Sequence, residues 1–248
     1  MRRFSPLLGI VICIAAWQIA IMATRSPLIP GPWEVALAIV ELARRGLLLK
    51  YVVASLFRVT WGYTAALVLA IPLGLILGMW RRGEDAVNPV LQVLRPISPL
   101  AWIPIAILWF GVGDASAIFL IFLASFFPMT VAAMNAVHNV EATHLAAGAN
   151  FGLTRMQLVR SVVLPSVLPQ LVIAMRVTLG IAWLVVVAAE MIAVSSGLGF
   201  LIIDARNAGN RYDLVIAGMV LIGIVGVILD LVMRRLETLD FVRWGYAN

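Results

Sequence analysis

Long runs of apolar residues constrain this chain more than any other feature. The clearest cover about 52–80, 115–136, 167–194 and 214–233, and each reaches the roughly 20 residues needed to cross a bilayer core about 30 Å thick. Because lipid offers the backbone no hydrogen-bond partners, such runs cross only as helices. With 63% hydrophobic and 12% charged residues, the 248-residue chain is far more apolar than a soluble domain. We therefore predict an all-α integral membrane protein with one compact helical domain.

Two further runs raise the expected number of transmembrane helices to six. The run Leu7–Ala23 follows a short basic head, and we favour a retained span over a cleaved signal peptide because no persuasive small-residue cleavage site follows it. The run Val90–Phe110 contains Pro96, Pro99 and Pro104. Proline removes a backbone donor and bends a helix, so this span is expected to be kinked and packed against its neighbours.

The segments between these runs differ in character. Trp33–Arg45 repeats apolar residues at helical spacing with charges between them, which predicts an interfacial helix too short and too charged to span. Residues 81–89 are expected to form a polar loop, and residues 195–213 a loop that is able to hold a re-entrant turn. The polar stretch from His138 to about Val163 is the longest interruption after the first span.

The distribution of basic residues gives a topology. Six spans place both termini on one side, and if that side is the cytoplasm, nine basic residues lie inside against six outside. The inside group is Arg2, Arg3, Arg81, Arg82, Arg155, Arg160, Arg234, Arg235 and Arg243, and the outside group is Arg25, Arg44, Arg45, Lys50, Arg206 and Arg211. The bias is modest, and it places the stretch from His138 to Val163 in the cytoplasm.

Several kinds of catalytic site are missing from the sequence. Lys50 is the single lysine and follows two leucines, so the chain has no phosphate-binding loop of the kind that binds ATP. It has no Gly-x-Ser-x-Gly motif, and His138 and His144 share one polar loop without a cysteine or clustered carboxylates. Cys13, the single cysteine, lies in an apolar run. We predict a protein that is not an enzyme and that has no metal site and no cofactor.

Some charged residues lie within the expected spans, where an unpaired charge is costly, and four of them are candidates for a functional role. They are Arg58, Arg176, Glu190 and Asp230. One interpretation is a structural pairing that locks the helices together. The other is that Arg58, Arg176 or Glu190 lines a translocation path, in which case the arginines favour anions. The sequence leaves both open.

The stretch "NFGLTRMQLVRSVVLPSVLP" contains a short amphipathic segment. It starts at Gly152, offers Thr154 as an N-cap, and is expected to end at Leu164–Pro165, because the residue before a proline is pushed out of the helical region. Periodicity alone is equally compatible with a plain connector and with a helix that docks on a partner. The expected apolar face holds Met156, Val159 and Val163, with Arg155 and Arg160 toward another face.

A family resemblance adds to this pattern. The segment "AAGANFGLTRMQLVRSVVLPSVLPQL" resembles the cytoplasmic "EAA" loop of ABC importer permeases of the binding-protein-dependent type I class, with Ala146, Ala147, Gly152, Leu164 and Pro165 in matching positions. The segments "SLFRVTWGY", "RPISPLAWIPIAILWFGVGD", "MRVTLGIAWLVVVAAEM" and "SSGLGFLI" are similar to the nitrate, sulfonate, taurine and bicarbonate branch of that class. The resemblance covers residues 55–235.

This resemblance implies a six-span permease in the bacterial inner membrane with both termini in the cytoplasm. It implies a homodimer, two cytoplasmic ATP-binding subunits, an external solute-binding protein, and a small anion as solute. The chain would then divide into residues 1–54 (first span and external helix), 55–235 (permease domain, with a coupling loop at 138–165) and 236–248 (cytoplasmic tail). The implied ATPase-coupling residues are Ala146, Ala147, Gly152, Leu153, Thr154, Arg155, Met156, Val159, Arg160 and Pro165.

One position departs from the family pattern. The acidic position of the loop motif holds Ala146, and Glu141 lies five residues too early, so either this branch dispenses with the acid or Glu141 substitutes for it. Two other functions are weighed beside the importer. An ion-gradient-driven secondary transporter would need a buried carboxylate pathway, for which Glu190 and Asp230 are thin material, and a membrane scaffold or sensor would move no solute.

Overall fold

The computed structural model describes residues 5–24, 29–207 and 209–237, and within these ranges all regular structure is helical. The α-helices are α1 (Ser5–Thr24), α2 (Pro32–Arg44), α3 (Leu47–Met79), α4 (Arg81–Leu94), α5 (Ile103–Phe110), α6 (Asp114–His138), α7 (Ala142–Asn150), α8 (Arg155–Leu158), α9 (Leu164–Ala193), α10 (Leu198–Asn207) and α11 (Tyr212–Glu237). A 3₁₀ turn (Pro99–Trp102) precedes α5, and a π-helical turn (Val159–Val163) joins α8 to α9.

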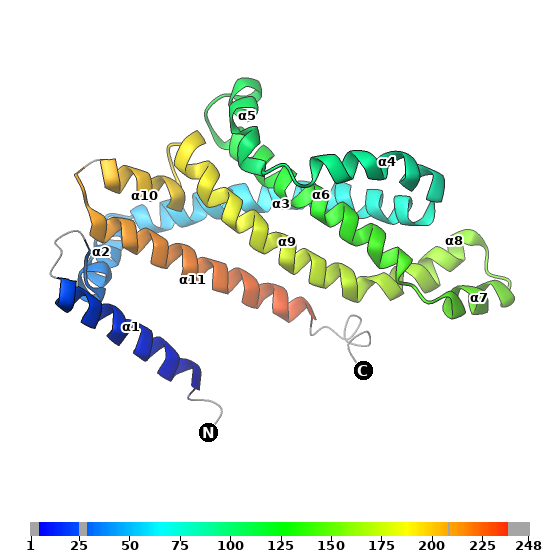
Figure 1. Cartoon of the computed structure of the whole chain (residues 1–248), viewed down its shortest axis with the longest axis horizontal. Coiled ribbons are helices and arrows are strands. Elements are labelled where there is room, and N and C mark those ends of the chain that lie inside the picture. Colours follow the sequence, from blue (N-terminus) through cyan, green and yellow to red (C-terminus); the bar gives the residue numbers. More distant parts are fainter. Residues whose placement is uncertain (1–4, 25–28, 208, 238–248) are drawn as a thin grey trace.

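Helices α3, α6 and α9 lie side by side along the long axis and form the core, with α11 and α10 packed on α9 (Figure 1). The contact between α3 and α6 follows a row of small residues spaced four apart, which are Gly62, Ala66, Ala70, Gly74 and Gly78. A Cβ atom at Gly62 would lie 2.7 Å from the carbonyl oxygen of Ile118, so the two backbones approach too closely for a larger side chain. Small residues give this close packing in membranes, where the hydrophobic effect does not hold helices together.

The two ends of the bundle are built differently. At the end we call the ion-pair end, α2 and α10 lie beside the start of α3 and the end of α9 (Figure 1). At the opposite end, which we call the loop end, α7 and α8 lie beyond the last turns of α3 and α6. Helix α1 packs against α2, and it carries exposed apolar side chains, including Ile19 and Met22, along its length.

The long spans agree with the sequence predictions, but six spans are not confirmed. By length and composition, four helical segments of the described residues are able to cross a membrane: Leu47–Met79, Asp114–His138, Arg155–Ala193 and Tyr212–Glu237. A fifth is added if α4 and the segment Pro99–Phe110 count as one bent span. In the first predicted span the apolar segment, Val11–Ala23, is shorter than these. The predicted cytoplasmic tail from residue 238 onward lies outside the described residues.

The predicted kinked span is broken rather than kinked. Helix α4 and the segment Pro99–Phe110 meet at 84°, because Pro96 and Pro99 remove backbone donors and Ser98, the residue before Pro99, leaves the helical region (ψ 130°). The Ser98 hydroxyl accepts a hydrogen bond from the Leu100 amide (3.4 Å) where the chain restarts as the 3₁₀ turn. The short helix α5 therefore projects away from the core (Figure 1).

Two predicted loops contain helices, and one predicted helix is confirmed. Residues 81–89 were expected to be a polar loop but form most of α4. The first turn of α4 contacts α6, since the Nε2 atom of His138 lies 3.0 Å from a carboxylate oxygen of Glu84. The predicted loop 195–213 contains α10, which packs on α9 and α11. The predicted interfacial helix corresponds to α2, and its Glu41 contacts Arg211 at 2.7 Å.

Candidate functional site

The loop end begins with a sharp turn between α7 and α8. Gly152 has a left-handed backbone (φ +74°), and its amide donates to the Ala149 carbonyl at 2.9 Å while the Leu153 amide donates to the Gly148 carbonyl at 3.2 Å. This pair of bonds is a Schellman motif, which closes a helix through a glycine because other residues are strained at positive φ. The tight entry expected at Gly152 is therefore present.

Helix α8 starts with a capping box, which confirms Thr154 as the N-cap. The Thr154 hydroxyl accepts from the Gln157 amide (3.4 Å), and the Thr154 amide donates to the Gln157 side chain (2.9 Å). Two amides that would otherwise lack partners are thus satisfied. The leucine side chain of Leu158 then covers Gly148, where an added Cβ would lie 2.5 Å from its Cδ1 atom. The turn and the first residues of α8 form one packed unit.

The predicted end of this helix at Leu164–Pro165 is wrong. The helical segment runs without interruption from Arg155 to Ala193, through the π-helical turn Val159–Val163. At the end of that turn, the Leu164 amide donates to the Val159 carbonyl, five residues back. The wider turn gives room for the ring of Pro165, which falls in the first turn of α9, where its missing N–H is tolerated. The loop segment and the transmembrane helix therefore form one continuous helical segment.

The predicted faces of the amphipathic segment are wrong for Met156 and Arg155, whereas Val159 and Val163 share a face as expected. Arg155, Val159 and Val163 are spaced four apart, and together they line a cavity of about 380 Å³ between the segment and the bundle. Met156 does not share their face, because its side chain is 62% exposed, and Phe151 in the turn is 86% exposed. The segment therefore presents two apolar side chains outward and keeps an arginine beside the cavity.

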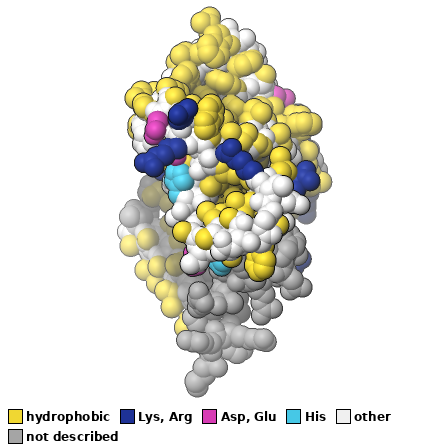
Figure 2. Space-filling view, turned by 90° about the vertical axis from the view of Figure 1, so that its right-hand side faces the viewer, with side chains coloured by type: hydrophobic (Ala, Val, Ile, Leu, Met, Phe, Trp, Pro, Cys, Tyr) yellow, Lys and Arg dark blue, Asp and Glu magenta, His cyan; other side chains and the backbone are white. Residues whose placement is uncertain are grey.

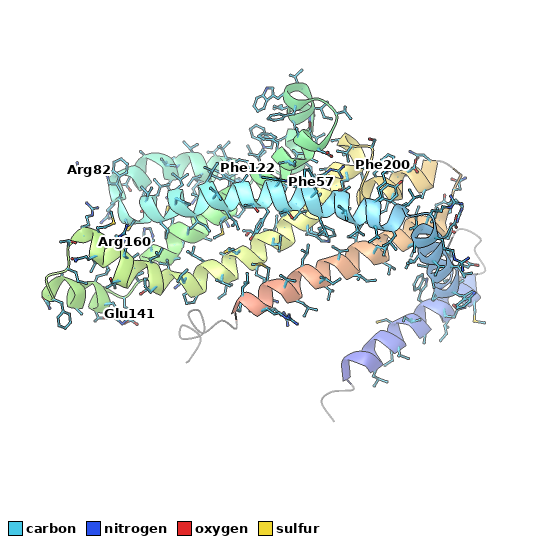
Figure 3. The ribbon with its side chains drawn as sticks, turned by 180° about the vertical axis from the view of Figure 1, so that it is seen from behind. Phe57, Arg82, Phe122, Glu141, Arg160 and Phe200 are labelled. Carbon is cyan, nitrogen blue, oxygen red and sulfur yellow. The ribbon has the colours of Figure 1, made fainter. Side chains whose placement is uncertain are left out.

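The remaining loop residues lie on the surface of the loop end. Ala146 and Ala147 on α7 are exposed, as is Arg160, whereas Leu153 is half-buried. Glu141 precedes α7 and accepts a hydrogen bond from the Thr143 hydroxyl at 3.1 Å. Figure 2 looks onto this end and shows Lys and Arg side chains around exposed hydrophobic surface, and Figure 3 places Arg82, Arg160 and Glu141 there.

At the ion-pair end, Arg58 of α3 and Glu190 of α9 form a buried ion pair with an N–O distance of 2.6 Å. The Arg58 side chain is 2% exposed and the Glu190 side chain is fully buried. The second Glu190 oxygen accepts from the Ser55 hydroxyl and the Gly199 amide, both at 2.9 Å. A buried charge is tolerated when it is paired and fully hydrogen-bonded, and this carboxylate is both.

The guanidinium of Arg58 joins three further groups to the ion pair. It donates to the carbonyl of Ser196 at 2.8 Å and to the hydroxyl of the same residue at 2.6 Å. It also contacts Asp114, the first residue of α6, at 2.7 Å, and the Asp114 side chain is 57% exposed. One arginine thus connects α3, α6, α9 and the turn before α10.

Two glycines of the segment "SSGLG" shape the space around Glu190. Gly197 has φ +112°, and a Cβ atom on it would overlap the Glu190 carboxylate. A Cβ atom on Gly199 would overlap the carbonyl of Val187 and the Cβ atom of Glu190. This turn wraps the carboxylate closely because it carries no side chains there.

The third charged candidate lies apart from this network. Arg176 of α9 contacts Asp230 at 2.5 Å and Glu237 at 3.2 Å, both on α11. Its side chain is 28% exposed, and it borders an open cavity of about 490 Å³ with Gly180 and Val177. The structure therefore brings Arg58 and Glu190 together and places Arg176 in a separate, partly exposed cluster.

Sequence reasoning missed the partners that complete both sites. Ser55, Ser196 and Gly199 hold the buried pair, and Gln157 completes the capping box. The signals were present, since Ser55 lies one helical turn before Arg58 and the spacing Thr-x-x-Gln is a capping-box pattern. Asp114 gave no signal, because it sits in a glycine-rich turn where an acid is ordinary.

These features define the class of the protein. The long apolar helices, a buried charge network at one end and an exposed, capped segment continuous with a transmembrane helix at the other are those of a multi-pass membrane protein. Residues 70–239 match the model of the family described as binding-protein-dependent transport system inner membrane component. The match spans more than half of the chain, and the chain belongs to this family.

Relatives and solved structures agree with this assignment. The chain is 34% identical to the taurine transport system permease protein TauC of Escherichia coli (strain K12) over 229 residues, which cover 89% of this chain and 82% of TauC. It is 33% identical to the nitrate import permease protein NrtB of Synechocystis over 248 residues, which cover 96% of this chain and 89% of NrtB. The inward-facing MetNI methionine ABC transporter (native CY5 crystal form) shares the fold, with a TM-score of 0.68, 22% identity and coverage of 78% of this chain and 96% of that chain.

The protein is therefore the permease subunit of an ABC importer, as the sequence resemblance implied, in the nitrate, sulfonate and taurine branch. It is a non-catalytic, multi-pass subunit of the inner membrane. ATP is hydrolysed on separate ATP-binding subunits, and a solute-binding protein belongs to the system. This assignment replaces the ion-gradient transporter and the scaffold that the sequence also allowed.

Proposed function

We propose that this permease imports a small oxyanion, of the sulfonate or nitrate type, that a separate binding protein delivers. The names of its relatives support this class, since they handle taurine and nitrate. The chain contributes the membrane path and binds no cofactor of its own. We place both termini and the loop end in the cytoplasm, as the excess of inside arginines suggests.

The observation that carries the mechanism is the continuity of the loop segment with α9. We propose that α7 and α8 dock on an ATP-binding subunit through the exposed side chains of Phe151 and Met156, with Arg155 and Arg160 at the edge of the contact. Exposed aromatic and methionine side chains are typical anchors of protein interfaces. Because Arg155–Ala193 is one helical segment, a displacement of the docked end moves α9 with it.

The assembly we propose contains two copies of this chain, two ATP-binding subunits and one binding protein. ATP binding closes the ATP-binding subunits, and the two loop ends follow, which switches the bundle between inward-facing and outward-facing states. Ala146 and Ala147 give α7 a flat surface for close contact in this scheme. Because Ala146 occupies the acidic position of the family's loop motif, the proposed contact contains no acidic residue at that position. Glu141, at the start of α7, lies outside the proposed contact.

The charged residues within the spans divide between two roles in this proposal. The pairing of Arg58 and Glu190 supports a structural role, because every Arg58 side-chain nitrogen has an acceptor within the chain and both Glu190 oxygens accept hydrogen bonds. Arg58 and Arg176 each border an open cavity, but the Arg58 side chain is 2% exposed and the Arg176 side chain is 28% exposed, which supports Arg176 as the remaining candidate for the translocation path. Replacing Arg176 with Gln is then expected to lower the uptake of an anion more than the stability of the permease.

The docking role is tested by replacing a basic and an apolar residue of α8 with acidic residues. The double variant R155E/M156D is expected to abolish ATP-driven uptake while the permease still inserts, because it places two acids on the proposed contact. The matched control is R206E/N207D, which changes two adjacent exposed residues of α10 by the same net charge at the ion-pair end. Co-purification with the ATP-binding subunit and uptake into proteoliposomes are the measurements. Normal uptake by R155E/M156D would sink the docking role.

A further inference from the structure

The cavity at the loop end is built as a defined pocket. Its floor is formed by the last turns of α3 and α6, one wall by α7, and the other by α8 and the π-helical turn. Its volume is about 380 Å³, within the range of small-molecule sites. Its lining residues are Gly78, Met79, Val137, His138, Val140, Leu145, Arg155, Leu158, Val159 and Val163.

This space does not come from loose packing of the transmembrane helices. Directly beneath it, a Cβ atom on Gly78 would lie 2.8 Å from the Cβ atom of Val137, so α3 and α6 are in close contact at the floor. The pocket opens because the loop segment stands off from them. The π-helical turn supplies Val159 and Val163 to its wall, and turns of this type occur often at functional sites.

The pocket combines an apolar lining with one available cation. Among the described residues, no hydrogen bond or ion pair satisfies the Arg155 guanidinium, which borders the pocket. His138, the other polar lining residue, is already engaged, since its Nε2 atom lies 3.0 Å from a Glu84 carboxylate oxygen. Arg155 is exposed at the edge of the pocket, so a molecule with an apolar body against the lining and one anionic group next to Arg155 would match the site.

We propose that this pocket binds one amphiphilic monoanion, a short aliphatic chain that ends in a sulfonate or a carboxylate. The chain would lie against Val140, Leu145 and Val159, and the head group would bond to Arg155. An occupant contacts both the loop segment and the floor helices, so it holds the segment in its present position. Resting on the docking role proposed above, this ligand slows coupled transport, because it stabilises one of the two states.

The direct test is binding of linear alkanesulfonates to the permease assembled with its ATP-binding subunits in nanodiscs, by calorimetry. Affinity is expected to rise about threefold to fourfold for each added methylene from propane- to hexanesulfonate, because each buried methylene contributes a fixed transfer free energy. R155Q is expected to weaken hexanesulfonate binding about tenfold or more, since it removes a charge-assisted hydrogen bond. An affinity that does not depend on chain length, or that R155Q leaves unchanged, overturns the proposal.

A pocket-filling variant gives an independent check. V140F places a ring inside the pocket and is expected to abolish hexanesulfonate binding, whereas A142F adds the same ring at an exposed position of α7 and retains it. Mass spectrometry of the purified complex separates the sources, because a co-purified fatty acid lost in V140F identifies a membrane-derived occupant. If the isolated permease binds the sulfonate and the assembled complex does not, the ATP-binding subunit fills the pocket and the proposal fails. Co-purification of the permease with the ATP-binding subunits tests the docking role independently of ligand binding to the pocket.

Discussion

The ion-pair end and the loop end each carry an arginine, but they differ in how far that arginine is buried and bonded within the chain. At the ion-pair end, Arg58 is 2% exposed, and each side-chain nitrogen has an acceptor within the chain. At the loop end, Arg155 and Met156 are exposed, and Phe151 is 86% exposed. Arg58 is bonded within its own chain, whereas Arg155 is exposed at the surface.

This difference separates residues that hold the fold from residues that serve a partner. Buried charges that bond to one another depend on every partner, because the loss of one partner leaves the other charge buried and unpaired. Exposed apolar and cationic side chains contribute little to the isolated chain and much to an interface. Substitutions at the ion-pair end should therefore change stability, and substitutions at the loop end should change coupling.

The largest effect is expected from E190L. It removes the buried carboxylate from Arg58, which keeps only the exposed Asp114 as a charged partner, and this should destabilise the permease by about 3–5 kcal/mol. The double variant R58M/E190L should recover a large part of that loss, because an apolar pair of similar size replaces the ions. Thermal unfolding in detergent measures both. Equal stability of E190L and the unmodified chain would remove the contrast between the two ends.

A smaller loss is expected from G197A. The new Cβ atom would overlap the Glu190 carboxylate on a backbone with φ +112°, and strain of this kind costs about 1–3 kcal/mol. The control is G223A on α11, where an added Cβ meets no atom within 4 Å. G223A should be neutral or slightly stabilising, because alanine favours helix. If the two variants lose equal stability, the turn does not wrap the carboxylate as described.

T154A addresses the loop end and should act locally. It removes the N-cap of α8, for which losses are about 1 kcal/mol. Hydrogen exchange of the α8 amides should accelerate while the core helices stay protected, and uptake should fall with it. The control T64A changes an exposed threonine in the middle of α3 and should leave α8 unaffected. Unchanged exchange in T154A would mean that the capping box is not what orders the segment.

The smallest effect concerns pH at the ion-pair end. Hydrogen bonding to Arg211 lowers the pKa of Glu41 below its usual value. A lowered pKa in the folded state gives stability that is present above the unfolded pKa of about 4.3 and is lost as pH falls through the folded value. The melting temperature should therefore drop slightly more below pH 4 in the unmodified chain than in E41Q. Identical pH profiles would show that this exposed contact adds nothing.

The sequence predicted the elements that depend on local pattern. Apolar length located α3, α6, α9 and α11, and the hydroxyl at Thr154 located the N-cap. The proline rule failed at Pro165, because a π-helical turn absorbed the ring, and it understated the break near Pro96. A single rule about prolines cannot separate these cases, since the outcome depends on how the neighbouring helices hold the turn.

The candidate site was predicted only in part for a related reason. The charges at Arg58 and Glu190 were recognised, but their pairing is set by tertiary contact between residues 132 positions apart. The apolar face of the loop segment was assigned from periodicity alone. In the structure Val159 and Val163 face the bundle, whereas Met156 is exposed. Long-range partners decide both outcomes, and spacing along the chain does not encode them.

The unbroken helix from Arg155 to Ala193 has a mechanical consequence. Its 39 residues give a contour length of about 58 Å at a rise of 1.5 Å per residue, with the Arg58–Glu190 pair near one tip and a bend between α8 and α9 (Figure 1). Because α3, α6 and the turn before α10 hold it there, the helix would act as a lever with its fulcrum at the ion-pair end if an ATP-binding subunit docks at the loop end as we propose. A tilt of about 5° then sweeps the opposite tip by about 5 Å, roughly one helical pitch. In the proposed mechanism, a small displacement of the docked end would therefore produce a movement that decreases along the helix toward the ion-pair end.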